Sequence, residues 1–281
     1  MTENNPLQKY FRQPAIYVKL PSGGKFYPEG VLEMPENGEI PVYPMTAMDE
    51  ITSRTPDSLF NGSAVMQIFK SCVPNIRDPW AIPQTDMDLL LTAIKIASYG
   101  HQMDMSVTCP HCNEEQDYSL DLRTVIDQFQ TPNYDTPAQV GDMEVYFRPL
   151  SYSEINEASK VQFENQKAMQ VVEGSEITEE EKLSAMGQAL QRITGLSLDA
   201  MVNSIAAIKV DGQTVTDRTH IKEFMGNATR DVFNRIRDTL ANIRTVGELK
   251  PLSIKCSNEE CGKDYQQPFT LDMSNFFVLG S

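Results

Sequence analysis

Two pairs of cysteines that lie far apart in the sequence constrain this chain more than any other feature. The first pair lies in CPHC (109–112) and the second in CSNEEC (256–261). Their surroundings repeat, because SVTCPHCNEEQDYSLDL (106–122) and SIKCSNEECGKDYQQPFTLDM (253–273) both place serine and a β-branched residue before the first cysteine and Asp-Tyr after the second. Each copy is typical of a strand, a turn and a second strand. The apolar residues expected on the buried face are Met105, Val107, Ile254, Phe269 and Leu271.

Four thiolates on two short turns can surround a single metal ion. Structural zinc sites are closed tetrahedra of cysteine and histidine ligands, and they keep no open position for water. The sequence therefore predicts a structural Zn²⁺ site without a catalytic role. Its four ligands are Cys109, Cys112, Cys256 and Cys261.

Other interpretations of the four cysteines stay open, because the second loop is Cys-X4-Cys. Two disulfides, buried free thiols and a redox Cys-X-X-Cys are the alternatives. The N-terminus lacks the basic-then-apolar pattern of a signal peptide, so we expect a reducing compartment in which disulfides are rare. A redox motif normally opens a helix, whereas Asn113, Glu114 and a strand-like run follow Cys112. His111 could replace one cysteine ligand or lie outside the ligand set.

Charge excludes some classes of partner. The chain has 24 Lys and Arg against 39 Asp and Glu, a net charge of −15. This balance opposes non-specific binding to nucleic acid or anionic membranes, and no apolar run reaches the length of a membrane span. We expect a soluble, cytoplasmic protein with neither partner. The fifth cysteine, Cys72, lies in an apolar helical stretch and is expected to be a small core residue.

The pattern predicts an α+β fold that is mainly helical, with small β units, a discontinuous zinc ribbon and an inserted domain of helices and a β-hairpin. Residues 1–45 are expected to form an N-terminal arm and a small β unit. Residues 46–128 with 248–281 are expected to form a helical core with the split ribbon, and 129–247 the insert. The boundary is the turn-rich TPNYDTPAQVGD (131–142).

In the first part, alternation at 15–20 and an extended piece at 39–43 predict strands, with a turn at Pro21–Gly24. The match of Ser22-Gly23-Gly24-Lys25 to Ser-X-X-Lys is interpreted as this turn, because the glycines disfavour a helix. Helices are predicted after Thr46, over Ser63–Cys72, and from an Asp86 cap to Gly100. The last of these helices runs directly into the first cysteine strand, so the helix and the ribbon are expected to share one core. Trp80 is expected to pack in that core rather than to form a binding platform.

In the insert, a strand through Val145 and Phe147 is followed by a helix with Ser153 as its cap. Thr178 and Glu181 form a capping box before a helix that carries one apolar stripe, and another short helix is expected at 196–205. Asp211-Gly212 predicts a hairpin, and an amphipathic helix is expected at 219–243. The stripe consists of Leu183, Met186, Leu190 and Ile193.

The sequence contains none of the motifs of metalloproteases, serine hydrolases, dinucleotide-binding folds or EF-hands. The three histidines are His101, His111 and His220, and none has the spacing of a nucleophile and its base. We therefore expect no catalytic residues and no enzymatic activity.

A family resemblance rests on two stretches of the sequence. YPMTAMDEITSRTPDSLFNGSAVMQIFKSCVPNIRDPWAIPQTDMDLLLTAIKIASYGHQMDMSVTCPHC (43–112) and LPSGGKFYPEG (20–30) resemble the baseplate hub proteins of T-even-like contractile-tailed bacteriophages. The resemblance covers about the first 125 residues, and its recurring part is Leu89–Cys112. It implies a structural or assembly (chaperone-like) protein of the tail baseplate, with other baseplate, hub and tail proteins as partners. The expected location is the virion tail baseplate, or the host cytoplasm during assembly.

Two other functions are weaker alternatives. A nucleic-acid-binding zinc ribbon would need basic and aromatic surface. The residues in and beside the two cysteine loops instead include Glu114, Glu115, Glu259 and Glu260. A thiol oxidoreductase would need a helix after the cysteines.

Overall fold

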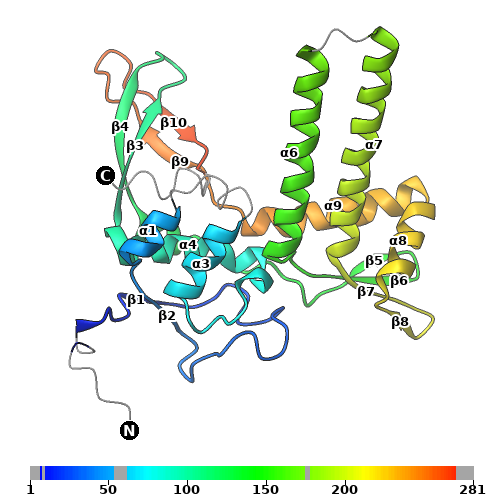
Figure 1. The fold of residues 1–281 in the computed structure, drawn as a ribbon, viewed down its shortest axis with the longest axis horizontal. Helices are drawn as coiled ribbons and strands as arrows, with labels where there is room; N and C mark the ends of the chain where they lie inside the picture. The colour runs from blue at the N-terminus through cyan, green and yellow to red at the C-terminus, as the bar shows by residue number, and fades with distance from the viewer. Residues whose placement is uncertain (1–6, 8–9, 54–61, 175–177, 270–281) are drawn as a thin grey trace. The chain divides into compact units, whose positions relative to one another are not determined.

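A computed structural model describes residues 7, 10–53, 62–174 and 178–269 (Figure 1). Helices and small antiparallel sheets alternate along the chain, so the predicted α+β class is confirmed. The chain divides into two compact units, residues 1–79, 86–130 and 248–281, and residues 80–85 and 131–247. The domain limits predicted from the sequence stay a prediction.

The first unit begins with a small β unit. Strand β1 (Ile16–Val18) pairs antiparallel with β2 (Ile40–Val42). The predicted turn is present, and Gly23 and Gly24 adopt φ of 63° and 83°, which side chains disfavour. It does not form a hairpin, however, because the strand after the turn is the distant β2. The N-terminal arm is tied down at Arg12, whose guanidinium donates to the carbonyl of Ser71 at 2.7 Å.

The helical segments that follow among the described residues are α1 (Ala47–Ser53), α3 (Ser63–Cys72), the 3-10 turn η2 (Pro79–Ala81) and α4 (Gln84–Tyr99). The Thr46 cap is confirmed, since its hydroxyl accepts from the Asp49 N–H at 3.2 Å. The Asp86 cap is wrong. Asp86 lies inside the first turn of α4, fully buried, and accepts from the Ser22 N–H at 2.7 Å and the Tyr27 hydroxyl at 2.9 Å. This carboxylate therefore fixes the N-terminal turn against α4.

Two hairpins complete the first unit. Strand β3 (Gln102–Thr108) pairs with β4 (Glu115–Asp121), and β9 (Leu252–Lys255) pairs with β10 (Asp264–Gln267). The short helix α5 (Leu122–Ile126) follows β4. Phe269 is buried but lies beyond the end of β10, which corrects its assignment to a strand. Leu271 lies outside the described residues.

The second unit contains a four-stranded antiparallel sheet in the order β5-β6-β7-β8. The strands are β5 (Ala138–Val140), β6 (Met143–Phe147), β7 (Ile205–Val210) and β8 (Gln213–Val215). The hairpin prediction is confirmed, because Asp211 and Gly212 connect β7 to β8 with φ of 50° and 73°. Trp80 stacks on Tyr152 with ring centroids 5.4 Å apart. It is half-buried in this unit and outside the apolar cluster of the ribbon, so its predicted place in the core of the first unit is wrong.

Two long helices stand side by side between β6 and β7 in the chain, α6 (Tyr152–Gly174) and α7 (Glu179–Asn203) (Figure 1). The capping box of Thr178 is confirmed. The Ser153 cap is wrong, because Ser151 pairs with Glu154 in that role, its N–H donating to the Glu154 carboxylate at 2.8 Å. The separate helix predicted at 196–205 is also wrong, since α7 is continuous to Asn203.

The helix predicted at 219–243 is two helices, α8 (Arg218–Asn227) and α9 (Arg230–Gly247). The chain leaves the helical conformation at Ala228, whose ψ is 144°. Apolar residues of both helices are buried with the sheet, including Ile221 and Ile236 at 0% exposure, so this face forms core as predicted. No helix within the described ranges has both the length and the apolar character that crossing a membrane requires.

Candidate metal centre

The ends of the two hairpins bring the four cysteines together. Cys109 follows the last residue of β3, and Cys256 follows the last residue of β9. The second cysteine of each pair lies in the turn before the return strand. Because each hairpin carries one cysteine pair at its tip, the sequence repeat becomes two similar knuckles (Figure 1).

The two knuckles share a backbone geometry although their loops differ in length. The N–H of Cys109 donates to the carbonyl of Glu114, and that of Cys256 donates to the carbonyl of Lys263, both at 2.9 Å. The residue after each second cysteine has positive φ, 57° at Asn113 and 53° at Gly262. Asparagine and glycine tolerate this conformation best. The two additional residues of the second loop are therefore accommodated without changing how the knuckle closes.

Strand register corrects one detail of the repeat. Val107 lies opposite Gln116 in the first hairpin, and Ile254 lies opposite Tyr265 in the second. Counted from the cysteines, Gln116 and Tyr265 are thus the equivalent residues. The sequence alignment instead paired Tyr118 with Tyr265. In the structure Tyr118 lies two residues further along β4 than Gln116, so the Asp-Tyr match is shifted by two residues.

Sulfur positions agree with a four-thiolate metal site. The Sγ atoms of Cys109 and Cys261 are 4.0 Å apart, those of Cys112 and Cys256 are 3.6 Å apart, and all four lie within 4.8 Å of one another. A tetrahedron with metal–sulfur bonds of about 2.3 Å has edges of about 3.8 Å. A disulfide would need about 2.05 Å. The four side chains could therefore hold a metal ion and do not form disulfides in this geometry.

The thiols of the cluster differ in acidity. Burial raises the pKa of Cys109, but hydrogen bonds from the backbone N–H groups of His111 and Cys112, together with those from the thiols of Cys112 and Cys256, outweigh it and bring the pKa to about 7. For Cys256, burial dominates and raises the pKa to about 12. Metal ions bind the thiolate form, and a bound cation deprotonates its cysteine ligands. The environment of Cys109 thus already favours the ligand state.

A glutamine joins the two hairpins beside the cysteines. The side-chain N–H of Gln116 donates to the carbonyl of Lys255 at 3.1 Å, and the N–H of Ser257 donates to the Gln116 side-chain oxygen at 2.6 Å. These two backbone groups flank Cys256. The sequence analysis did not identify Gln116. The available signal was a polar residue at a position of β4 where the alternation of the strand places side chains facing inward. The amide acts as a clamp between the halves of the site.

Apolar residues from both hairpins form one cluster beneath the knuckles. Val107 and Leu120 come from the first hairpin, and Ile254 and Tyr265 from the second. Ile96 of α4 packs against this cluster, so the helix and the ribbon are in contact as expected. The two hairpins therefore share a core as well as the cysteines.

Other residues considered from the sequence lie apart from the cluster. His111 is exposed and is not in the group of potential ligands. Cys72 is fully buried in α3, where burial raises its pKa to about 12, which is typical of an unreactive core thiol. Cys109 follows a strand rather than opening a helix, so the geometry of a redox Cys-X-X-Cys is not present.

Comparison with known proteins identifies one family. The family model described as T4 bacteriophage base plate protein matches residues 14–278. Neither the curated proteins nor the solved structures gave a match. The matched range includes both cysteine pairs.

Proposed function

This chain belongs to the T4 bacteriophage base plate protein family, and from that premise we propose that it is a structural or assembly (chaperone-like) protein of the tail baseplate hub. It acts through contacts with other baseplate, hub and tail proteins, in the virion tail or in the host cytoplasm during assembly. The observation that carries the proposal is the family match over residues 14–278.

A structural Zn²⁺ at the cysteine cluster would make the ribbon rigid. Four thiolates in a tetrahedral arrangement suit zinc, and the ligands would be Cys109, Cys112, Cys256 and Cys261. Zinc bound by small domains contributes apparent folding free energies of about 10 kcal/mol. Because the two pairs are separated by 144 positions between Cys112 and Cys256, the ion would close a long loop. The ribbon then offers a fixed surface to neighbouring subunits.

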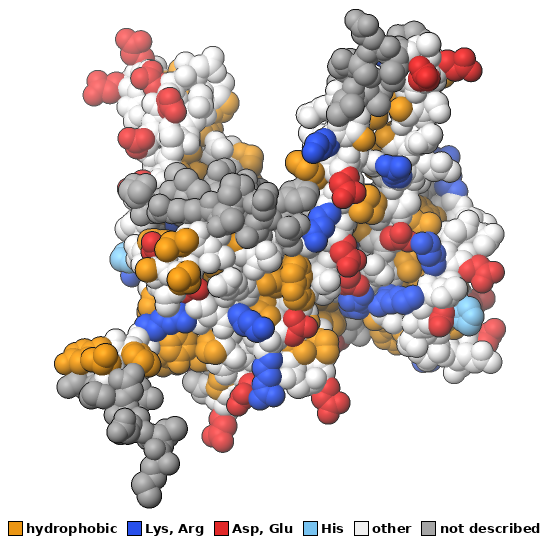
Figure 2. Space-filling view, in the orientation of Figure 1, with side chains coloured by type: hydrophobic (Ala, Val, Ile, Leu, Met, Phe, Trp, Pro, Cys, Tyr) orange, Lys and Arg blue, Asp and Glu red, His pale blue; other side chains and the backbone are white. Residues whose placement is uncertain are grey.

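The surface near the knuckles favours proteins over nucleic acid as partners. Figure 2 shows acidic side chains gathered at one end of the ribbon. The exposed acidic residues in and directly after the two turns are Glu114, Glu115, Glu259 and Glu260. Nucleic-acid ribbons need basic surface to bind phosphates. A four-cysteine site also has no open coordination position, which supports a role without catalysis.

Quantitative mass spectrometry on two samples tests this function. The first sample is purified intact tails, and the second is the set of complexes captured with this chain from infected cells. A structural protein is expected in both, and an assembly factor only in the second. Recovery of the chain without any tail protein in either sample would contradict the proposal.

A further inference from the structure

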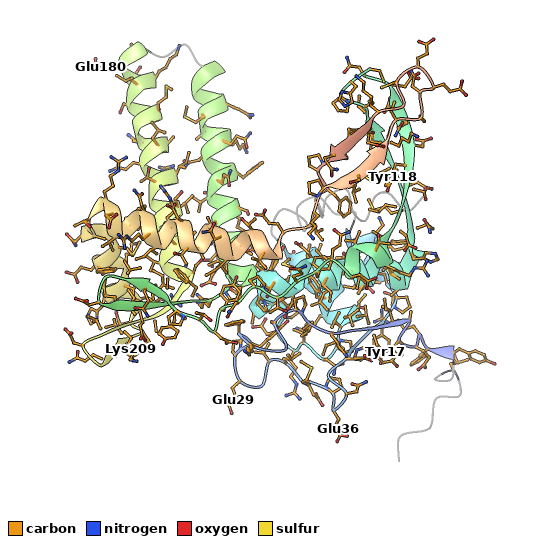
Figure 3. All side chains as sticks on the ribbon, turned by 180° about the vertical axis from the view of Figure 1, so that it is seen from behind. Tyr17, Glu29, Glu36, Tyr118, Glu180 and Lys209 are labelled. Carbon is orange, nitrogen blue, oxygen red and sulfur yellow. The ribbon has the colours of Figure 1, made fainter. Side chains whose placement is uncertain are left out.

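A cavity of about 440 Å³ lies in the second unit and is lined by residues of α6, α7 and α8. It is at the end of the long helix pair opposite Glu180, which Figure 3 labels. The apolar part of its wall consists of Ala158 and Val161 from α6 and Leu196 and Ala200 from α7. Residues three or four positions apart share one helix face, so each long helix turns one face to the cavity. A cavity of this size and lining can enclose a small organic group.

Most charged side chains at the cavity are held in ion pairs. Nη1 of Arg148 donates to the Glu154 carboxylate at 3.1 Å. Nζ of Lys222, from α8, lies 2.6 Å from Oδ1 of Asp199 on α7. Glu154, Asp199 and Lys222 all line the cavity. These charges therefore have partners before any ligand binds.

Arg218, the first residue of α8, lines the same cavity and is held through one nitrogen. Its Nη1 donates to the carbonyls of Val202 at 2.7 Å, Asn203 at 3.4 Å and Ile205 at 2.5 Å. No residue of the described ranges accepts a hydrogen bond from its Nε or Nη2, and neither atom is enclosed without a partner. The protein thus fixes the guanidinium and leaves its Nε–Nη2 edge accessible. Two parallel N–H groups on such an edge match the two oxygens of a carboxylate.

The electrostatic surroundings of Arg218 favour an anion. Burial lowers the pKa of Arg218, the nearby Arg148 lowers it further, and Glu154 has the opposite effect. A guanidinium keeps its charge at every pH of interest, so the lowered pKa means that this charge is incompletely compensated. An anion at the open edge would supply the missing compensation.

We propose that the cavity binds one carboxylate group carried on an apolar stem. The carboxylate lies on the Nε–Nη2 edge of Arg218, and the stem lies along the apolar wall formed by α6 and α7. Lys222 is one helical turn from Arg218 on the same side of α8, so its positive charge adds to the attraction. A free acid and an acidic residue of another protein both carry this group.

The other charges at the cavity select against phosphate. Glu154 and Asp199 line it together with Glu157, which is exposed and has no ion-pair partner among the described residues. Like charges repel in proportion to their size. A phosphate group carries more than one negative charge at neutral pH, whereas a carboxylate carries one. The apolar wall also offers no hydrogen bond to a third or fourth oxygen. We therefore expect the site to prefer a carboxylate.

NMR chemical-shift titration of the full chain with hexanoate measures the binding. Hexanamide has the same stem without the charge, and inorganic phosphate has charge without the stem. Hexanoate is expected to bind at least about tenfold more tightly than either, because it alone satisfies both parts of the site. No binding of hexanoate by the wild-type chain, or tighter binding of phosphate, would overturn the proposal.

Two variants test the assigned residues. Arg218→Lys keeps the charge but removes the fork, and it should raise the dissociation constant for hexanoate more than about tenfold. Arg192→Lys makes the same change at an exposed position of α7 outside the lining and should behave as wild type. Because Arg218 also binds the end of α7, a second variant, Ala158→Leu, fills the cavity from α6 with Arg218 unchanged. Its control is Ala168→Leu on the exposed surface of α6. Hexanoate binding that survives either Arg218→Lys or Ala158→Leu would overturn the proposal.

Two further measurements distinguish the sources of the carboxylate. Native mass spectrometry of the chain purified from infected cells detects a free acid as extra mass that hexanoate displaces. Release of a tail protein from captured complexes on addition of hexanoate indicates an acidic residue of that protein, and this measurement alone rests on the proposed function. If hexanoate displaces neither, the cavity has no carboxylate ligand in the infected cell and the proposal falls. The titration itself depends neither on the metal site nor on the role in the baseplate.

Discussion

Replacing Gln116 with alanine tests whether the two hairpins are fixed to each other by more than the cysteines. The side chain is 9% exposed and bonds to backbone groups on both sides of Cys256. Gln116→Ala removes these two hydrogen bonds, together with a longer one to the Tyr265 hydroxyl at 3.4 Å, and leaves the carbonyl of Lys255 and the N–H of Ser257 without this partner. We expect the second hairpin to open more often while the cysteines remain in place.

The size of the effect follows mainly from the two lost bonds to the backbone. Each hydrogen bond contributes about 1 kcal/mol net, and a poorly satisfied buried group adds a further cost. Together they give about 2–3 kcal/mol. Because 1.4 kcal/mol corresponds to a factor of ten, the amides of the ribbon should exchange roughly 30 to 150 times faster.

Hydrogen exchange followed by mass spectrometry measures this opening in the whole protein at equal metal content. Gln266→Ala is the matched control, because its exposed side chain bonds to Ser253 within one hairpin at 2.8 Å. That variant should change exchange by less than about threefold. Equal exchange in the Gln116 and Gln266 variants would refute the clamp.

Further predictions concern stability in the two units. Burial raises the pKa of Asp88 to about 6, above its value of about 3.9 in an unfolded chain, so the folded chain binds the extra proton. The free energy of unfolding should then fall as pH rises from about 4 to 6. Asp88→Asn should abolish this fall and stabilise the protein at pH 7 by up to ~3 kcal/mol. Urea unfolding at several pH values measures this, and a variant with the same pH profile as the wild type would contradict the prediction. Ile236→Ala should cost about 2–5 kcal/mol, because the side chain is fully buried. Ile193→Ala on the exposed stripe should cost less than about 0.5 kcal/mol, and thermal unfolding that ranks the two alike would be inconsistent with the burial.

Local sequence signals predicted the elements that local chemistry specifies. Asp211-Gly212 identified its hairpin because both residues tolerate positive φ, and the Thr178 capping box identified the start of α7. The signals were less precise where two residues compete for one role. Ser151 rather than Ser153 caps α6, because Glu154 completes its capping pair three residues later.

Tertiary contacts account for most of the remaining differences. Asp86 resembles a helix cap in the sequence, but its partners Ser22 and Tyr27 are distant in the chain. The break between α8 and α9 at Ala228 could not be seen in the sequence, because apolar residues recur at helical spacing on both sides of it. The cluster of four cysteines could be predicted from their spacing, whereas Gln116 depends on a partner in the other hairpin. An apolar stripe on a helix, such as that of α7, does not indicate whether other residues of the same chain cover it.

Native mass spectrometry of the purified protein tests most directly whether the two cysteine pairs close over one ion. We expect one zinc ion per chain, lost in both the Cys112→Ser and the Cys256→Ser variants and retained in Cys72→Ala, which removes a thiol that is not part of the cluster. A correctly folded wild-type ribbon without metal, or zinc retained after either serine substitution, would contradict the account.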